Sequence, residues 1–154
     1  MLTSFKRSTF TIFSITFMSL TLVLVAGCTL NKKVSDKTLM FADFAKVEEL
    51  TSQEEERVVI LDVRNFEKFQ DKHIEGAFNI YTPNIRRREQ LLLGEPIIIV
   101  YSSGEVRDNL STAACKRLLN LGYGNVYNYR AGLKDWVKNE GKTEVTELMA
   151  DLAE

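Results

Sequence analysis

The chain has 154 residues, 45% of them hydrophobic, and its 20 basic residues nearly balance its 21 acidic residues. This length is enough for one domain with a buried core, and we find no room for a second domain. The balanced charge argues against nucleic acid or an anionic membrane surface as the main partner.

The N-terminal segment has the layout of a secretory signal. Lys6 and Arg7 precede an uncharged, apolar stretch at about residues 8–26, which ends in small residues just before Cys28. The run Leu-Val-Ala-Gly-Cys resembles the bacterial lipoprotein signal, in which the cysteine becomes the lipidated first residue of the mature chain. We therefore expect residues 1–27 to be a signal peptide and Cys28 to carry a lipid such as palmitate. The alternative is an uncleaved helix that spans the membrane.

Either arrangement places the rest of the chain at the bacterial cell envelope, where it faces the periplasm or the cell exterior. Residues 28–37 are mostly polar, and we expect them to form a flexible tether. Removal of the signal leaves 18 basic residues against 21 acidic ones, a formal charge of −3. Once Cys28 carries lipid, Cys115 has no partner for an internal disulfide.

Residues 38–142 alternate between two kinds of apolar pattern. Continuous runs rich in β-branched residues predict buried strands, and apolar residues at near-helical spacing predict helices. Strands are expected at 39–41, 58–61, 97–101 and 125–129, and helices at 44–50, 85–93 and 110–121. This alternation predicts an α/β fold with a central, mostly parallel sheet flanked by helices. Apolar residues at helical spacing also predict an amphipathic helix over residues 143–154.

A loop of six residues follows the strand at 97–101 and leads into the helix at 110–121. It consists of Ser102, Ser103, Gly104, Glu105, Val106 and Arg107. Binding sites in parallel sheets form at the carboxyl ends of the strands. Backbone N–H groups and the dipole of the following helix favour an anion there, so we expect this loop to bind one.

Four segments in the same order resemble the rhodanese family of sulfurtransferases, over roughly residues 38–142. These segments are Leu61-Asp62-Val63-Arg64, the short acidic and aromatic stretch Phe66–Phe69, His73-Ile74-Glu75-Gly76-Ala77-Phe78-Asn79-Ile80, and Tyr127-Asn128-Tyr129-Arg130-Ala131-Gly132-Leu133-Lys134-Asp135-Trp136. The resemblance implies a rhodanese-like fold. It also implies that the loop 102–107 is the place where the family carries Cys-x-x-x-x-Arg and holds sulfur as a persulfide.

Two departures from the family pattern fall in this loop. Ser102 stands in place of the cysteine, and the glycine lies at 104 rather than one position later. A serine hydroxyl needs an adjacent base to react, and an oxygen atom cannot store transferable sulfur. The related phosphatases have a loop one residue longer, so phosphatase is the poorer match.

Several other polar residues are expected to be structural. Asp62 and Arg64 should hold loops together by charge-assisted hydrogen bonds. His73, the only histidine, has no metal set or nucleophile near it in the sequence, and we expect neither a metal nor another cofactor. The run Arg86–Arg88 is typical of a solvated helix face.

The sequence therefore predicts an envelope lipoprotein domain without sulfurtransferase activity, which binds a protein partner or a small oxyanion and no nucleic acid. The main alternative is a sulfurtransferase that uses Cys115 as a relocated thiol, although this residue is expected to be buried. A serine hydrolase would need His73 against the Ser102 hydroxyl. A scaffold whose loop has no ligand is the remaining possibility.

Overall fold

The computed structural model of the protein describes residues 34–53, 55–88, 92, 94 and 96–146. None of the helices within these ranges is long and apolar enough to cross a membrane. Short 3-10 helices lie at Asp36–Thr38 and Thr82–Asn84. The helices are α2 (Phe44–Thr51), α3 (Phe66–Asp71), α4 (Ile85–Arg88), α5 (Leu110–Asn120) and α6 (Gly132–Lys138). The strands are β1 (Met40–Phe41), β2 (Val58–Asp62), β3 (His73–Ile74), β4 (Phe78–Asn79), β5 (Ile97–Tyr101), β6 (Val126–Tyr129) and β7 (Thr143–Glu144).

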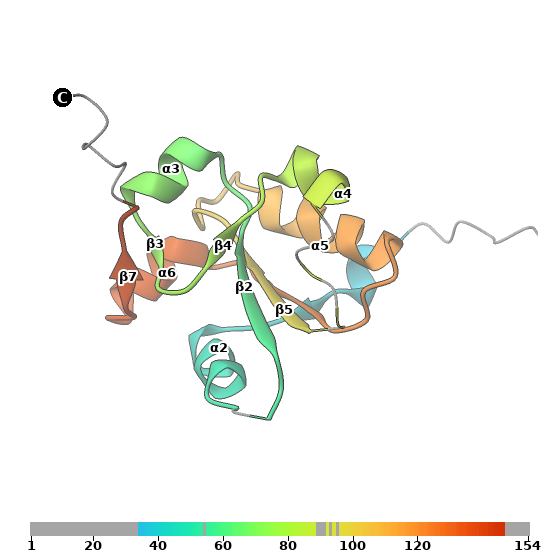
Figure 1. Ribbon diagram of the computed structural model, residues 1–154, viewed down its shortest axis with the longest axis horizontal. Coiled ribbons are helices and arrows are strands. Elements are labelled where there is room, and N and C mark those ends of the chain that lie inside the picture. Colours follow the sequence, from blue (N-terminus) through green and yellow to red (C-terminus); the bar gives the residue numbers. More distant parts are fainter. Residues whose placement is uncertain (1–33, 54, 89–91, 93, 95, 147–154) are drawn as a thin grey trace, which may run out of the picture. The chain divides into compact units, whose positions relative to one another are not determined.

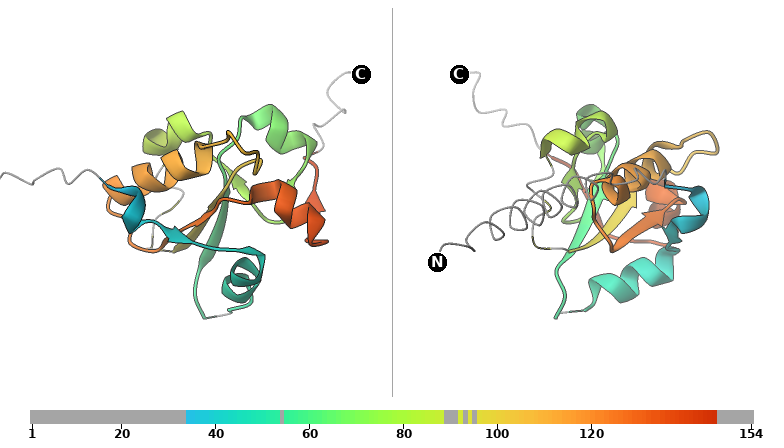
Figure 2. Two further views of the ribbon diagram at one scale, coloured as in Figure 1. Left: turned by 180° about the vertical axis from the view of Figure 1, so that it is seen from behind. Right: turned by 90° about the vertical axis from the view of Figure 1, so that its right-hand side faces the viewer.

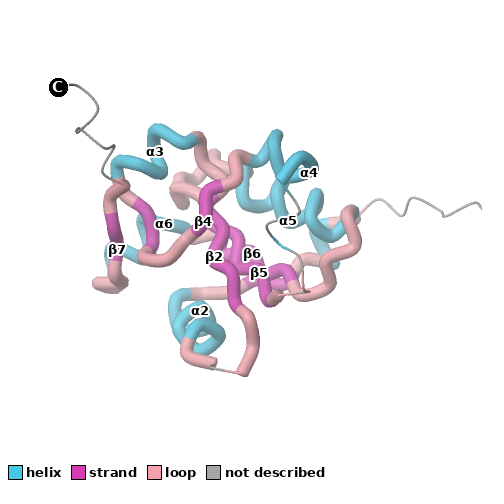
Figure 3. Tube along the Cα trace, in the orientation of Figure 1, coloured by secondary structure: helices cyan, strands magenta, loops and turns pink. Residues whose placement is uncertain are grey.

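A five-stranded sheet forms the centre of the domain, in the order β1-β6-β5-β2-β4. Every neighbouring pair in it is parallel. The α/β class and the mostly parallel sheet predicted from the sequence are therefore confirmed. A second, two-stranded sheet pairs β3 with β7 in antiparallel register. Figure 3 shows the central strands surrounded by helices.

Both faces of the central sheet are buried, which explains why its strands are continuous apolar runs. In β5, Ile98 and Val100 face one core cluster, whereas Ile97, Ile99 and Tyr101 face the other. Helices α4 and α5 lie on one side of β2 and β5, and α2 and α6 lie on the other (Figure 1). Burial of each such Ile or Leu side chain contributes about 1.5–3 kcal/mol.

The C-terminal segment differs from the predicted helix over 143–154. Thr143 and Glu144 form β7, and the Thr146 amide donates to the carbonyl of Gln70, so the chain is extended up to residue 146. The β-branched residues Thr143 and Val145 favour this extended conformation. Residues 147–154 lie outside the described part of the chain.

The expected tether is also shorter than predicted at its C-terminal end. Val34 packs against the core, and the Ser35 side chain caps the 3-10 helix that begins at Asp36. The Asp36 carboxylate lies 2.5 Å from the Lys116 ammonium on α5. The apolar and acidic side chains of this segment therefore attach it to the domain. Residues 1–33, including the predicted signal and Cys28, lie outside the described residues.

Candidate functional site

The carboxyl ends of β2, β4, β5 and β6 meet at one edge of the sheet, as their parallel pairing requires (Figure 2). The loop after β5 borders a pocket of about 380 Å³ there. Its lining residues are Arg64, Asn65, Lys68, Tyr81, Ser103, Glu105, Asp108 and Leu110. A second pocket of about 450 Å³, beside exposed Phe66, shares Asn65 and Tyr81 with the first.

Two glycines let the loop pack directly against the start of α6. Gly104 and Gly132 have positive φ values of 81° and 63°. A Cβ atom on Gly104 would lie 1.8 Å from the carbonyl oxygen of Ala131, so only glycine fits. The Leu133 amide donates to the carbonyl of Ser102 over 2.9 Å, and this bond fixes the loop on α6. The glycine position that departs from the family pattern therefore has a packing role.

Ser102, at the expected nucleophile position, is buried with 1% of its surface exposed. Its hydroxyl has no hydrogen-bond partner of ordinary geometry among the described residues. The hydroxyl lies near the Asp108 carboxylate, whose pKa it helps to lower. A carboxylate with a lowered pKa is a weak base, so it is poorly suited to activate a serine. The site therefore offers no strong nucleophile at position 102.

The Asp108 carboxylate accepts hydrogen bonds from both sides of the loop. The sequence analysis did not single out this residue. One oxygen accepts from the Ser103 amide over 3.0 Å and also from the Ser103 hydroxyl. The other accepts from the Leu110 amide over 2.9 Å. Partial burial would raise the pKa of Asp108, but these hydrogen bonds outweigh it and leave the pKa below its usual value. An Asp just before a predicted helix is the capping signal that points to this residue in the sequence.

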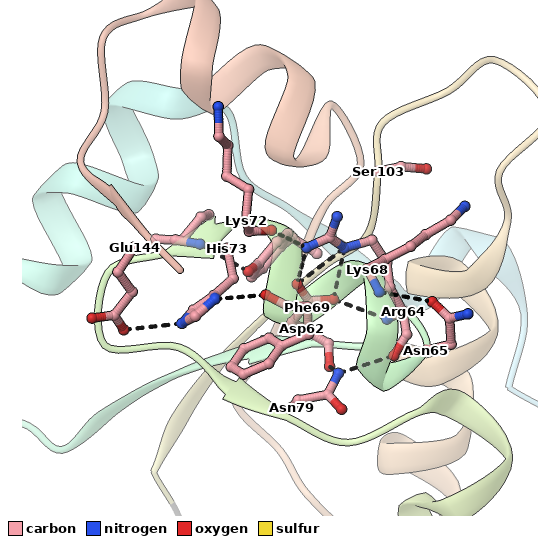
Figure 4. A network of polar contacts seen from close by, with 12 residues as sticks. Asp62, Arg64, Asn65, Lys68, Phe69, Lys72, His73, Asn79, Ser103 and Glu144 are labelled. Carbon is pink, nitrogen blue, oxygen red and sulfur yellow. Dashed lines mark hydrogen bonds and ion pairs between the residues drawn. The ribbon is translucent and has the colours of Figure 1, made fainter. Parts of the chain in front are cut away.

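Asp62 and Arg64 form a buried ion pair beneath the pocket (Figure 4). The Arg64 guanidinium donates to both oxygens of Asp62, with the shortest N–O distance at 2.6 Å, and also to the carbonyl of Lys72. Burial would lower the pKa of Arg64, but Asp62 raises it overall. The two residues thus join the end of β2 to the end of α3. This pair is structural in the way the sequence analysis expected.

His73 lies in a separate network (Figure 4). One ring nitrogen contacts the carbonyl of Phe69 at 2.8 Å, and the other contacts the Glu144 carboxylate at 3.1 Å. Its ring also stacks on Phe69. Both nitrogens are therefore engaged away from the Ser102 hydroxyl, and the arrangement that a serine hydrolase would need is not formed.

Cys115 lies inside α5 and is fully buried among core residues. Burial raises the pKa of its thiol to about 12. The thiol is consequently protonated at neutral pH, and neither pocket beside the loop includes it.

The last three residues of the loop, Glu105 to Arg107, are exposed. Val106 is 93% exposed, and Arg107 is also exposed and does not line the pocket. Glu105 lies 3.6 Å from the Lys134 ammonium, a surface pair that contributes little. Lys68 lines this pocket beside Arg64, and its side chain extends toward the side on which Ser103 lies (Figure 4). The sequence analysis did not single out this lysine.

Outside the loop, Arg86 and Arg87 are exposed on α4, as a solvated helix face requires. Within the described ranges, no cluster of His, Cys, Asp and Glu side chains has the arrangement of a metal site.

The sheet order and the loop between β5 and α5 define a parallel α/β domain whose candidate site lies at the carboxyl edge of the sheet. The family model for the rhodanese-like domain matches residues 45–139, and the chain belongs to this family. The BH2092 protein from Bacillus halodurans is similar in structure, with a TM-score of 0.63, 27% identity, and coverage of 71% of this chain and 80% of that one. The Alr3790 protein from Anabaena has a TM-score of 0.60 and 28% identity, over 68% of this chain and 80% of that one.

Curated relatives include sulfur-handling proteins and a phosphatase. The thiosulfate sulfurtransferase GlpE of Shewanella oneidensis is 29% identical over 84 residues, which are 54% of this chain and 79% of that protein. The putative sulfur carrier protein YrkF of Bacillus subtilis is 32% identical over 58% of this chain and 45% of its own length. Human dual specificity protein phosphatase 6 is 31% identical over 61% of this chain and 23% of its own length. The chain thus spans less than half the length of the last two.

Proposed function

We propose that this domain is a rhodanese-like binding module that lacks sulfurtransferase activity and binds a protein partner at the carboxyl edge of its sheet. The observation that carries the proposal is Ser102, a buried hydroxyl with the weakly basic Asp108 carboxylate beside it, at the position that the sequence resemblance assigns to the reactive thiol. Oxygen at this position cannot form a persulfide. Cys115 is a poor substitute because it is buried and its pKa is raised to about 12.

A protein partner is favoured over a small anion by what the edge exposes. Val106 on the loop is 93% exposed, Phe66 at the start of α3 is 55% exposed, and Tyr81 between the two pockets is 40% exposed. Exposed aromatic and aliphatic side chains gathered beside a pocket are typical of protein interfaces. The Asp108 carboxylate already accepts from N–H groups that an anion would need.

We further propose that the domain is tethered to the envelope through lipid on Cys28, which lies outside the described residues. If this is correct, a Cys28→Ser variant should move from the membrane fraction to the soluble fraction. The variant should also fail to incorporate labelled palmitate. Wild type should stay in the membrane fraction and incorporate the label.

The test of the missing activity is production of thiocyanate from thiosulfate and cyanide by the full chain. The Shewanella enzyme serves as the positive control. We expect wild type and Cys115→Ala to give the same background rate, because neither has a usable thiol. Thiocyanate formation by wild type that disappears in Cys115→Ala would establish the relocated-thiol alternative instead.

Partner binding is tested with a photo-crosslinking amino acid placed at Val106 and, as a matched control, at Val137. Val137 is also an exposed valine but lies in the last turn of α6, away from the loop. A discrete protein adduct at 106 that is missing at 137 is the expected result. Equal adducts at both positions, or none at 106, would contradict binding at this edge.

A further inference from the structure

The Asp108 carboxylate is held by backbone and hydroxyl donors of the kind that bind an anion. It accepts from the amides of Ser103 and Leu110, which lie at the two ends of the loop, at 3.0 and 2.9 Å. It accepts as well from the Ser103 hydroxyl. The buried Ser102 hydroxyl lies beside the same carboxylate without a hydrogen bond of ordinary geometry. Amides and hydroxyls that converge before a helix are the donors that an oxyanion requires.

An internal carboxylate has two advantages over a free anion. It is attached to the loop by its own backbone, so its effective concentration at the donors is far above that of a solute. It is also negatively charged, so it repels a second anion in the same place. The lowered pKa of Asp108 keeps the group ionised at neutral pH.

We propose that Asp108 determines the ligand specificity of the loop, because its carboxylate fills the anion position and excludes free oxyanions such as sulfate, phosphate and thiosulfate. This inference rests on the proposed function and makes it more specific, since it excludes free oxyanions and keeps a protein partner as the ligand of this edge of the sheet. The neighbouring Glu105 does not have this role, because its carboxylate is exposed and pairs with Lys134 instead.

The experiment is calorimetric titration of the full chain with sodium sulfate, phosphate and thiosulfate. Wild type is compared with Asp108→Asn, which removes the charge but keeps a side chain of the same size. Glu105→Gln is the matched control, because it removes one negative charge from the same loop without exposing its amides. We expect no binding heat from wild type or Glu105→Gln at millimolar anion, and at least about tenfold tighter binding by Asp108→Asn.

Binding by wild type as tight as by Asp108→Asn would overturn the inference. An equal gain in Glu105→Gln would overturn it too, because net charge alone would then explain the effect. No gain in a folded Asp108→Asn variant has the same consequence, since removal of the negative charge should admit the anion.

A measurement on wild type alone covers the case in which Asp108→Asn does not fold. In amide NMR spectra of the wild-type chain, the Ser103 and Leu110 signals should stay in place as sulfate is added. Saturable shifts of both signals would contradict an occupied loop. This outcome differs from failure of the proposed function, which would appear as thiocyanate production with the two signals unmoved.

Discussion

At the scale of single residues, Ser102 and Asp108 set what the loop is able to do. Ser102 places at the end of β5 a buried hydroxyl without a hydrogen-bond partner of ordinary geometry in the described part of the chain, and the Asp108 carboxylate accepts from the Ser103 and Leu110 amides. The surrounding scaffold is complete, because the Asp62–Arg64 pair and the close contact of Gly104 with the β6–α6 turn are both formed. Under our proposal, the loss of activity therefore rests on a few side chains of one loop.

Asp108 should make the stability of the domain depend on pH in a definite direction. Its pKa is lowered in the folded state, so its hydrogen bonds stabilise the fold above the unfolded value of about 3.9. This contribution is lost as the pH falls through the folded value. We expect Asp108→Asn to lower the free energy of unfolding by about 1 kcal/mol at pH 7 and by less at pH 3. Urea unfolding of both proteins across this range measures the difference, and a gap that does not change with pH would contradict the assignment.

Cys115 should be unreactive as long as the domain is folded. Its thiol is fully buried, and burial raises its pKa to about 12. In a Cys28→Ser background, we expect labelling by a thiol-reactive disulfide at pH 8 to be at least about a hundredfold slower in the native chain than in urea. The rate is followed by absorbance of the released thiolate. Native labelling within about tenfold of the unfolded rate would mean that this thiol is available for chemistry.

At the scale of elements, the short strand β7 pairs with β3 and attaches the C-terminal segment to the domain. The Glu144 carboxylate on β7 accepts from the Gly76 amide at 2.9 Å and contacts the His73 ring. The Trp136 indole donates to the carbonyl of Lys142 just before this strand. The two Glu144 contacts join residues about seventy positions apart in the chain, so they hold the loop after α3 against β7.

Loss of the Glu144 carboxylate should weaken the attachment of β7 to the loop after α3. Glu144→Ala leaves the Gly76 amide and one His73 nitrogen without their partner, and we expect the free energy of unfolding to fall by about 1 kcal/mol. Glu75→Ala is the control, because the Glu75 side chain forms an exposed ion pair with Lys142 and its removal should cost less than about 0.5 kcal/mol. Urea unfolding at pH 7 compares the two variants. Equal effects would show that the Glu144 contacts are no stronger than surface pairs.

At the scale of the whole molecule, the sequence was sufficient for the class of fold and for the positions of its main strands along the chain. Strands buried on both faces leave a continuous apolar run, as in Ile97–Tyr101, and this signal needs no tertiary information. The helix predicted from residue 143 is wrong for Thr143 and Glu144, because apolar spacing does not report their pairing with a distant strand. The position of Asp108 could not be predicted for a similar reason. A carboxylate near a helix start suggests a cap, but only the folded loop shows that it also binds the Ser103 amide.

The most direct test of the account is the mass of the intact chain after incubation with thiosulfate. A Cys28→Ser background leaves Cys115 as the one remaining thiol. We predict that the mass is unchanged, because neither Ser102 nor the buried thiol takes up sulfur. A gain of one sulfur atom that cyanide removes, located by peptide mapping within residues 34–146, would contradict the account.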